Sequence, residues 1–345
     1  MGRQMTQVAI LGTGLIGASI GLALKQNSDV KLDQIIGYDR ERRNSRQAKK
    51  IGSIDKEEGN LANAVREAGL IILAAPILSN HKLIEEIAPF VAEGAVVTDT
   101  GSTKAATLLH AAEHLPQGVH FVGSHPMSGK TEVGPEHADA DLFKDQRWVI
   151  TAPPGASQDS VKVVISLAHG VGALPMIMDA EEHDAYVAAI SHMPMVAAHA
   201  LFQLARRSEA WPELSLLAAG GFKSSTRLAA TDPSMAYDIV ATNREQTVHW
   251  VDRFIEELRR IRDDINNDDR EELFTQIAKT ELDYSAYLLG IVGRKEEGPA
   301  VHTAGLDFST MLVGQAMKDK IDQMSEGSEE RVRERELESR LKRDI

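Results

Sequence analysis

Residues 7–17 read QVAILGTGLIG, and this stretch decides the fold of the N-terminal half. A short apolar strand pattern runs directly into G-x-G-x-x-G, and a helical pattern begins within the motif, which is the context that dinucleotide binding requires. The first glycine permits the tight turn, the second lets the backbone approach a pyrophosphate, and the third allows close packing of the helix. The unpaired N–H groups of the helix then face the phosphates. The predicted phosphate-binding residues are Gly12, Gly14, Leu15, Ile16 and Gly17.

The residue that ends the second predicted strand indicates which dinucleotide is bound. Asp39 comes roughly 20 residues after the last glycine of the motif, where an acid bonds the ribose hydroxyl groups of NAD and repels the 2′-phosphate of NADP. Arg40, Arg42 and Arg43 follow, and an arginine there can instead accommodate that phosphate. We expect NAD as the cofactor; the alternative is a glycine turn that binds no ligand. The other predicted cofactor contacts are Arg40, Ala75 and Pro76.

Around this motif, short apolar runs alternate with helical stretches from residue 6 to residue 178. Most of these runs lack polar alternation, as expected for parallel strands that are buried on both faces. Strand–helix alternation of this kind predicts an α/β, Rossmann-type doubly wound sheet over residues 1–178. The predicted strands are 7–11, 34–38, 70–74, 95–99, 120–124, 147–151 and 174–178.

The pattern changes at residue 179. Asp179 and Glu182 have the spacing of a capping box, and helical periodicity continues to about Met324. We predict an all-helical domain over 179–325, including helices at 270–289 and 307–324. A charged tail over 326–345 is predicted to be solvated and partly helical, with partner binding as the alternative. The stretch 185–205 is apolar on much of its surface, so it must be buried, and a homodimer interface is one way to bury it.

Composition excludes several classes of protein. The 345 residues carry a formal net charge of −13 and no cysteine. Disulfides, thiolate nucleophiles and cysteine-bound metals are therefore excluded, and without a basic stripe we expect no nucleic-acid partner. The N-terminus shows no secretory signal pattern, and no apolar run approaches membrane-spanning length. We expect a cytoplasmic protein that has no membrane partner.

Two polar segments follow predicted strands, at the edge where open α/β sheets bind ligands. Residues 99–104 read DTGSTK and are candidates for the ligand site. The alternative is that Ser102 or Thr103 caps the next helix, and both interpretations can hold, because a capping hydroxyl can also face the site. Residues 124–129 read SHPMSG. Pro126 disfavours helical geometry at His125, and an imidazole held rigidly near the expected nicotinamide is a good proton acceptor. The alternative for His125 is a hydrogen-bonded structural residue.

The helical domain contributes further candidates. His192 lies within the long helix, where a packed helix histidine is the alternative interpretation. His183 and Asp184, near the start of that helix, are interpreted as N-terminal capping and surface charge. Lys223 and Arg227 follow a glycine pair, and a guanidinium can hold a carboxylate by two parallel bonds, although a surface ion pair explains the arginine equally well. No H-E-x-x-H or similar spacing occurs, so no metal site is expected.

Taken together, these segments resemble the prephenate/arogenate dehydrogenase family from about Val8 to about Leu289. The order and spacing of the segments, rather than any single one, make the resemblance specific. The segments are the glycine motif at 12–17, then 99–104, 124–127 with Gly129, 191–194, 221–227 and 243–244.

The resemblance implies NAD-dependent oxidative decarboxylation of prephenate to 4-hydroxyphenylpyruvate, a step in tyrosine biosynthesis. It implies that His125 accepts the proton of the ring 4-hydroxyl, that Ser102 lies near that hydroxyl and the nicotinamide, and that Arg227 grips the ring carboxylate. His192 and Lys223 would line the pocket around the substrate side chain. The helical domain would be a dimerisation domain, with the active site in the cleft between the domains.

Three alternatives stay open. The substrate side chain can carry an amino group instead of a keto group, which would make the protein an arogenate or a dual cyclohexadienyl dehydrogenase. A β-hydroxyacid-type dehydrogenase also combines a Rossmann domain with a helical domain, but it uses a lysine base on the long helix and leaves His125 unexplained. A sensor that binds NAD without turnover is also compatible with the fold alone.

Overall fold

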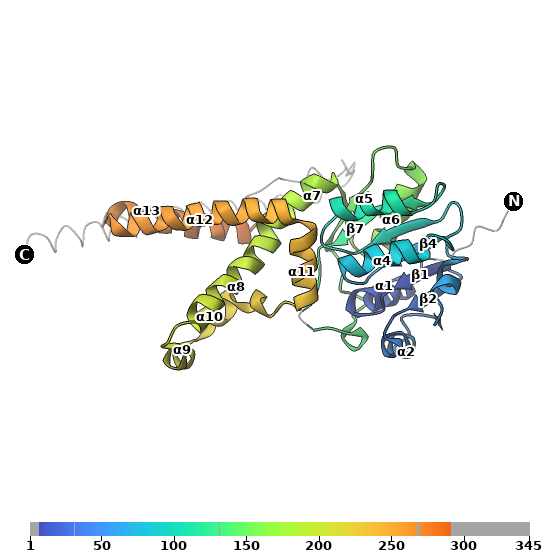
Figure 1. The fold of residues 1–345 in the computed structure, drawn as a ribbon, viewed down its shortest axis with the longest axis horizontal. Coiled ribbons are helices and arrows are strands. Elements are labelled where there is room, and N and C mark those ends of the chain that lie inside the picture. The colour runs from blue at the N-terminus through green and yellow to red at the C-terminus, as the bar shows by residue number, and fades with distance from the viewer. Residues whose placement is uncertain (1–6, 31, 131, 268–269, 291–345) are drawn as a thin grey trace, which may run out of the picture. The chain divides into compact units, whose positions relative to one another are not determined.

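The computed structural model describes residues 7–30, 32–130, 132–267 and 270–290 (Figure 1). The chain divides into two compact units, Met1–Asn266 and Asn267–Ile345. The second unit contributes one described helix, α13 (Arg270–Leu288). The predicted helix over 307–324 and the charged tail over 326–345 lie outside the described residues. The first unit contains both sheets and all the candidate site residues.

A six-stranded parallel sheet has the strand order β3-β2-β1-β4-β5-β6. The order reverses between β1 and β4, and open sheets bind ligands at such a reversal, outside the carboxyl ends of the strands. The short, polar strand β3 is not predicted from the sequence because it has no apolar pattern. The strands are β1 (Gln7–Leu11), β2 (Gln34–Tyr38), β3 (Lys56–Glu57), β4 (Leu70–Leu73), β5 (Val96–Asp99) and β6 (His120–Phe121).

The chain passes into a second sheet at Val122. The single strand predicted over 120–124 is wrong, because β6 ends at Phe121 and β7 (Gly123–Pro126) pairs elsewhere. In the second sheet β7 runs antiparallel to β8 (Arg147–Thr151), which is parallel to β9 (Leu174–Ile177). An apolar run does not reveal its pairing partner, so this change of sheet becomes visible only in the fold. It places His125 opposite Val149.

Helices pack on the first sheet, and strand β1 shows how. Val8 and Ile10 belong to a core that includes residues of α1 and α6. Ala9 and Leu11 belong to a second core, with residues of α3, α4 and α5. Because alternate side chains face opposite sides of a sheet, burial on both sides explains why β1 is apolar throughout. These helices are α1 (Leu15–Gln26), α2 (Arg42–Lys50), α3 (Leu61–Val65), α4 (Ile77–Ile87), α5 (Ala105–His114) and α6 (Gln158–Gly170).

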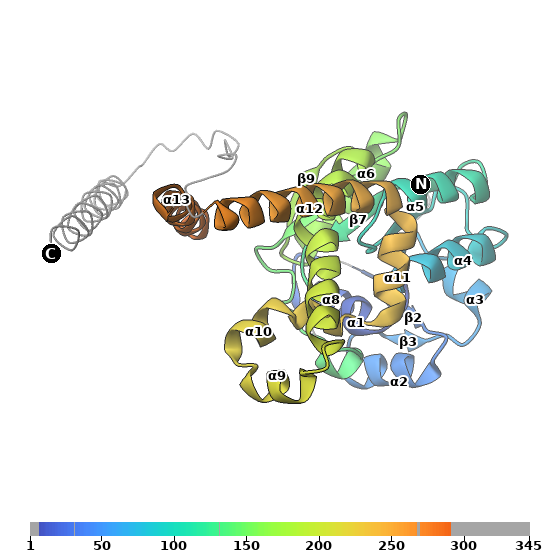
Figure 2. The same cartoon turned by 60° about the vertical axis from the view of Figure 1, so that its left-hand side comes forward.

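The helical part begins where the sequence predicts it. The Asp179 carboxylate accepts hydrogen bonds from the backbone N–H groups of Glu181 and Glu182, at 2.8 and 3.2 Å, and caps α7. Helix α8 continues from α7 through the π-helical segment η2, and α12 packs against α8 (Figure 2). The elements are α7 (Ala180–Val187), η2 (Ala188–His192), α8 (Met193–Arg206), α9 (Trp211–Leu217), α10 (Gly220–Ser225), η3 (Arg227–Ala230), α11 (Pro233–Thr242) and α12 (Arg244–Asn266).

The continuous helical stretch Ala180–Arg206 is long and apolar enough to cross a membrane, judged by length and composition alone. The expectation that no apolar run approaches that length is therefore wrong. The stretch nevertheless buries His183, Asp184 and His192. Two of these side chains bond to residues of the sheet domain, so the start of the stretch is anchored within the protein.

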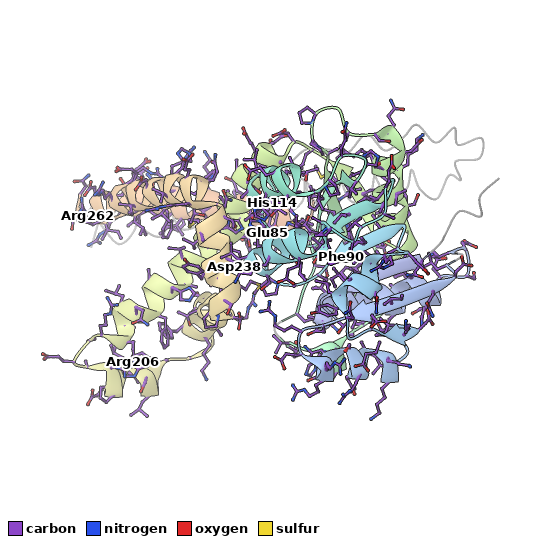
Figure 3. All side chains as sticks on the ribbon, turned by 45° about the vertical axis from the view of Figure 1, so that its right-hand side comes forward. Glu85, Phe90, His114, Arg206, Asp238 and Arg262 are labelled. Carbon is purple, nitrogen blue, oxygen red and sulfur yellow. The ribbon has the colours of Figure 1, made fainter. Side chains whose placement is uncertain are left out.

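The helical part is joined to the sheet part at the start of α4. Asp238 lies on α11, on the side of the helical part that faces the sheet part (Figure 3). Its carboxylate accepts a hydrogen bond of 3.0 Å from the backbone N–H of Leu78. Beside it, Ile77 packs with Met195 and Ile239 in a small buried cluster. This contact fixes α8 and α11 next to the loop that follows β4.

Candidate active site

The three glycines of the motif have different surroundings. Gly12 has a φ of +97°, and a Cβ there would lie 2.7 Å from the carbonyl carbon of Ala74. A Cβ on Gly17 would lie 2.0 Å from the carbonyl oxygen of Gly12. A Cβ on Gly14 would meet nothing within 4 Å. Tight packing therefore demands the first and third glycines, whereas the second faces open space at the N-terminus of α1.

This difference predicts opposite effects of two alanine substitutions. Gly14→Ala should lower the free energy of unfolding by at most about 1 kcal/mol, because only an N-cap glycine is lost. It should still raise the Kd for NAD at least about tenfold, since the methyl group occupies the approach of the pyrophosphate. Gly17→Ala should lower the free energy of unfolding by about 3 kcal/mol or more through overpacking. Urea denaturation and NAD titration measure both effects; equal destabilisation by the two changes would contradict the assignment.

The remaining candidate cofactor residues lie at the ends of β2 and β4, next to the glycine loop. The Asp39 carboxylate accepts a hydrogen bond of 2.8 Å from the Thr13 N–H, and Arg40 is exposed. After β4, the Asn80 side chain is buried and accepts a bond of 3.1 Å from the Ala75 N–H, which holds the loop containing Pro76. The predicted cofactor residues thus meet at the reversal of strand order.

Three side chains, one from β7 and two from α7, form a hydrogen-bonded chain. His125 Nδ1 lies 2.9 Å from His183 Nε2, and His183 Nδ1 lies 2.8 Å from Asp184 Oδ1. His183 and Asp184 are buried. Their interpretation as surface charge is wrong, because the start of α7 packs against the sheet domain instead of facing solvent.

The network assigns the proton positions along this chain. A carboxylate only accepts hydrogen bonds, so His183 Nδ1 donates to Asp184. In the tautomer of His183 that carries its proton on Nδ1 alone, Nε2 is an acceptor, and His125 Nδ1 donates to it. The lone pair of His125 is then on Nε2, which makes no hydrogen bond to the described residues. His125 is consequently oriented as a proton acceptor.

The surroundings keep His125 neutral. Burial lowers the pKa of His125 well below its ordinary value of 6.5, and the nearby His183, Lys104 and His192 act in the same direction. A neutral imidazole is the form that can take up a proton. The arrangement therefore provides a base that is not already protonated near neutral pH.

Lys104 and Asp99 form a buried ion pair beside this chain. The Lys104 ammonium contacts the Asp99 carboxylate and donates a hydrogen bond of 2.7 Å to the carbonyl oxygen of Ser124. Both charged side chains are almost completely buried. Burial lowers the pKa of Lys104, and Asp99 partly offsets this effect. The pair ties the end of β5 to the start of β7, and so to the segment that carries His125.

Helix α5 is capped differently from the prediction. Asp184 Oδ1 and Oδ2 accept hydrogen bonds from the backbone N–H groups of Lys104 and Ala105, at 2.8 and 2.9 Å. The alternative interpretation, that Ser102 or Thr103 caps this helix, is wrong, because the cap comes from Asp184 on a distant helix. Ser102 is partly buried in the loop between β5 and α5, and within the described residues its hydroxyl makes no hydrogen bond. That hydroxyl is available to a ligand.

His192 lies fully buried at the end of η2. Its Nδ1 is 3.2 Å from Asn243 Nδ2, which therefore donates to it, and Asn243 also donates a bond of 2.7 Å to the Asp184 carbonyl oxygen. The other ring nitrogen, Nε2, has no hydrogen-bond partner among the described residues. A buried polar atom without a partner is costly, so this nitrogen marks a place where a ligand can bond.

Burial lowers the pKa of His192 to about 4, while Asp184 raises it and His183 lowers it further. Below about pH 6.5 His192 takes up a proton in the unfolded chain but not in the folded chain. The contribution of His192 to the free energy of unfolding is therefore largest above that pH and decreases as the pH falls toward 4. The stability difference between the wild type and His192→Gln should therefore shrink as the pH falls from 7 to 4. Urea denaturation at several pH values measures it, with His199→Gln on the same helix as control. A difference independent of pH would contradict this cause.

The two predicted substrate cations lie apart from the histidine chain. Lys223 on α10 and Arg227 on η3 are exposed, and neither forms an ion pair within the described part of the chain. Leu228, next to Arg227, packs against the cluster of Ile77 and Met195. Arg227 therefore neighbours the junction between the sheet domain and the helices, but the structure brings neither cation into contact with His125.

Sequence reasoning did not include His183, Asp184, Lys104 and Asn243 among the site residues. The signal for the first two was present as an adjacent histidine–aspartate pair at the start of the long helix. Neither their burial nor their contact with His125, which is 58 residues away in sequence, can be read from that local pattern. Lys104 and Asn243 lay inside segments already quoted for the resemblance, but nothing local indicated their partners.

The fold and the site together define a class of protein. The dinucleotide-binding edge belongs to the first sheet. The chain leaves that sheet after β6 and enters β7, which carries a histidine oriented as a base. This combination is that of a Rossmann-type, NAD-dependent oxidoreductase.

Comparison with known proteins identifies the family. Residues 20–176 match the family "Prephenate dehydrogenase, nucleotide-binding domain", and residues 179–279 match "Prephenate dehydrogenase, dimerization domain". Prephenate dehydrogenase of Bacillus subtilis is 34% identical over 82% of this chain and 76% of its own length. Cyclohexadienyl dehydrogenase of Zymomonas mobilis is 28% identical over 79% of this chain and 93% of its own. The chain belongs to the prephenate dehydrogenase family.

A solved structure agrees with this result. Prephenate dehydrogenase from A. aeolicus, in complex with hydroxyphenyl propionate and NAD+, is 26% identical, with a TM-score of 0.76. The similarity covers 83% of this chain and all of that one. The predicted fold class, a Rossmann-type sheet followed by a helical domain, is confirmed.

Proposed function

We propose that the chain catalyses the NAD-dependent oxidative decarboxylation of prephenate to 4-hydroxyphenylpyruvate. The observation that carries this proposal is the chain from His125 through His183 to Asp184, which leaves His125 Nε2 as a free proton acceptor. Family membership supports the substrate, and the open face of Gly14 supports a bound dinucleotide.

In the proposed reaction the residues of this chain orient the substrate and take one proton. His125 Nε2 accepts the proton of the ring 4-hydroxyl group as a hydride leaves the ring carbon that bears this group. NAD bound along Gly12, Gly14 and Asp39 supplies the hydride acceptor. The ring carboxylate departs as CO2, and the electrons of the broken bond complete the aromatic ring and leave a phenolate oxygen. His125 then returns the proton to that oxygen, which gives 4-hydroxyphenylpyruvate. The new positive charge on His125 is stabilised through His183 by the Asp184 carboxylate.

Other side chains are proposed to hold the substrate. Ser102 offers a free hydroxyl near the start of α5, and His192 Nε2 offers an unpartnered ring nitrogen toward the keto side chain. Arg227 is proposed to bind the ring carboxylate, because a guanidinium holds a carboxylate in a bidentate way. Lys223, one turn before it, would add a second cation. The exposure of both cations in the single chain is consistent with a site that closes around an anionic substrate.

We propose the domain division 1–178, 179–325 and 326–345; its first boundary is supported by the family matches, which meet between residues 176 and 179. We also propose a homodimer. The helical domain exposes many large apolar side chains, among them Ile190, Leu204, Leu216, Leu217 and Ile265. Burial between two copies of one chain removes such surface from water. Sedimentation equilibrium would test the dimer.

We also propose that the enzyme is cytoplasmic and has no membrane or nucleic-acid partner.

The experiment that tests the function is NADH production at 340 nm with purified protein, comparing prephenate with arogenate and NAD with NADP. Turnover of prephenate with NAD supports the proposal. Turnover of arogenate alone would make the protein an arogenate dehydrogenase, and turnover of both substrates would make it a dual cyclohexadienyl dehydrogenase. Either result would leave the proposed mechanism unchanged. Binding of NAD without turnover of either substrate would overturn the enzyme assignment in favour of a sensor.

A further inference from the structure

Two helices of the sheet domain carry histidines that the proposed reaction does not use. His81 and Glu85 lie on α4, and His110 and His114 lie on α5. Each pair is spaced by four residues, so both members lie on the same face of their helix. Helices α4 and α5 pack against each other, and Glu85 and His114 lie side by side across that contact (Figure 3).

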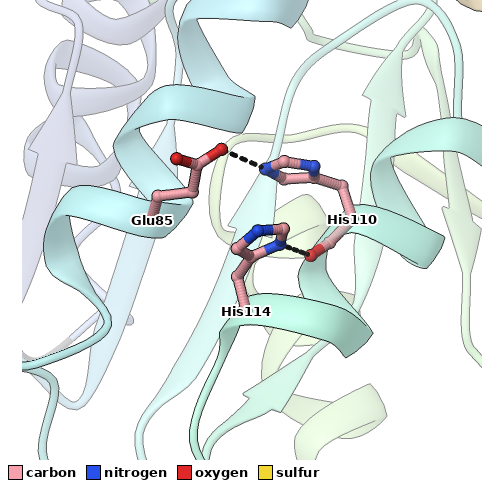
Figure 4. Close-up of side chains that lie close together, drawn as sticks. All are labelled: Glu85, His110 and His114. Carbon is pink, nitrogen blue, oxygen red and sulfur yellow. Dashed lines mark hydrogen bonds and ion pairs between the residues drawn. The ribbon is translucent and has the colours of Figure 1, made fainter.

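We propose that Glu85, His110 and His114 bind a divalent transition-metal ion, with Zn²⁺ as the representative ion. One potential ligand atom from each residue lies within 4.8 Å of the other two (Figure 4). His110 Nε2 and Glu85 Oε1 are already 3.2 Å apart. Two ligands of a tetrahedral zinc ion with bonds of about 2.0 Å are separated by roughly 3.3 Å. Rotation of the Glu85 and His114 side chains, both of which are exposed, would complete the site.

Contacts around the two histidines position their rings. His114 Nδ1 is 2.9 Å from the carbonyl oxygen of His110, to which it must donate, and its lone pair is therefore on Nε2. The His110 ring stacks on His114 at 4.2 Å and on His81 at 4.6 Å. His81 in turn bonds Thr107 of α5 at 3.0 Å. A second ring nitrogen that is already hydrogen-bonded, as in His114, is typical of histidines that ligate metals.

The position of the cluster favours a cation. Glu85 is close to the C-terminal end of α4, and His114 is the last residue of α5. Free carbonyl groups give helix C-termini a partial negative charge. His110 Nε2 lies near both Glu85 Oε1 and the His81 carbonyl oxygen, at 3.2 and 3.1 Å. A metal ion would displace the ring proton between these groups, and its charge would be balanced by the carboxylate.

The ligand set indicates the class of metal. Two imidazole nitrogens and one carboxylate oxygen suit Zn²⁺ and its neighbours in the first transition series. Ca²⁺ and Mg²⁺ prefer oxygen ligands only. With three protein ligands and an exposed setting, water would complete the coordination. Single-helix spacing does not reveal this site, because its ligands come from two helices that are joined only in the tertiary structure.

The site is separate from the proposed chemistry. The N-terminal ends of α4 and α5 follow the loops that carry Pro76 and Lys104, whereas the metal ligands lie toward the opposite ends. Helix α5 rises about 1.5 Å per residue, so His114 lies roughly 15 Å from Lys104. A bound ion would join α4 to α5 and raise the stability of the folded chain by mass action.

Titration of the metal-stripped full-length protein with Zn²⁺, by calorimetry and by competition with a chromogenic chelator, tests the proposal. One ion should bind per chain, and His114→Gln and Glu85→Gln should each weaken binding at least about tenfold. The matched control is His169→Gln, which removes an exposed histidine from the last turn of α6. The control should bind Zn²⁺ like the wild type, and Zn²⁺ should raise the Tm of the wild type but not of His114→Gln.

Three results would overturn the proposal. The wild type could bind no Zn²⁺ up to about 100 µM, the two ligand variants could bind it as tightly as the wild type, or the control could lose binding equally. NADH production measured in the absence of added metal should be the same in His114→Gln and the wild type. The metal site and the dehydrogenase activity can therefore fail independently. Retained folding of each variant is checked by circular dichroism.

Discussion

Replacing His125 with asparagine is expected to lower kcat by a factor of about 10²–10⁴, the usual contribution of a positioned general base. Asparagine can still donate a hydrogen bond to His183 Nε2, so the buried chain to Asp184 keeps its partner. It cannot take a proton from the substrate hydroxyl. NAD binding should be unchanged, because the glycine loop and Asp39 lie on other strands.

The matched control for this change is His120→Asn. His120 lies on β6 in the same stretch of chain, but it is not part of the histidine network. Steady-state kinetics and NAD titration of both variants give the comparison. A His125→Asn enzyme with more than about a tenth of wild-type kcat would contradict its role as the base. Loss of NAD binding together with kcat would indicate instead that the change disturbs the fold.

Replacing Lys104 with methionine is expected to lower the free energy of unfolding by about 3–5 kcal/mol, because it leaves one member of a buried ion pair uncompensated. Asp99 would keep the hydrogen bonds from the N–H groups of Gly101 and Ser124, at 2.9 and 3.1 Å. Those dipoles cannot replace a full positive charge in a site from which water is excluded. Methionine preserves most of the side-chain volume, so the effect measures the lost charge and not a cavity.

Lys25→Met provides the control for an exposed pair. Lys25 Nζ lies 2.6 Å from Asp55 Oδ1, a good ion-pair distance, but both side chains are partly exposed. Its loss should change the free energy of unfolding by about 0–1 kcal/mol. Urea denaturation of both variants at pH 7 measures the difference. If the two changes cost the same, the burial of the Lys104 pair would not be the source of its effect.

The Lys104 variant also connects stability with the proposed chemistry. Lys104 holds the Ser124 carbonyl oxygen one residue before His125, and its backbone N–H bonds to Asp184. A loosened segment 123–126 would let the His125 ring move relative to His183. We therefore expect kcat of Lys104→Met to fall even at temperatures where the variant remains folded, since small displacements of a catalytic group are costly.

The sequence by itself determined the glycine motif, the acid after the second strand, and the change from alternating elements to helices at residue 179. These features are local: strand, turn and helix preferences act over a few residues, and a fully apolar run already implies a strand covered on both faces. The resemblance to a known family rested on short segments in a fixed order, and it assigned roles to His125 and His192, which the local patterns had already singled out.

Only the tertiary structure decided what surrounds those residues. The passage of the chain at Val122 from one sheet to another, the capping of α5 by Asp184 and the contact of His183 with His125 all join segments distant in sequence. No local pattern encodes such pairings, because hydrogen bonds and burial depend on which surfaces the whole chain brings together. For the same reason the sequence does not reveal the cluster of Glu85, His110 and His114, because these residues lie on two helices that meet only after folding.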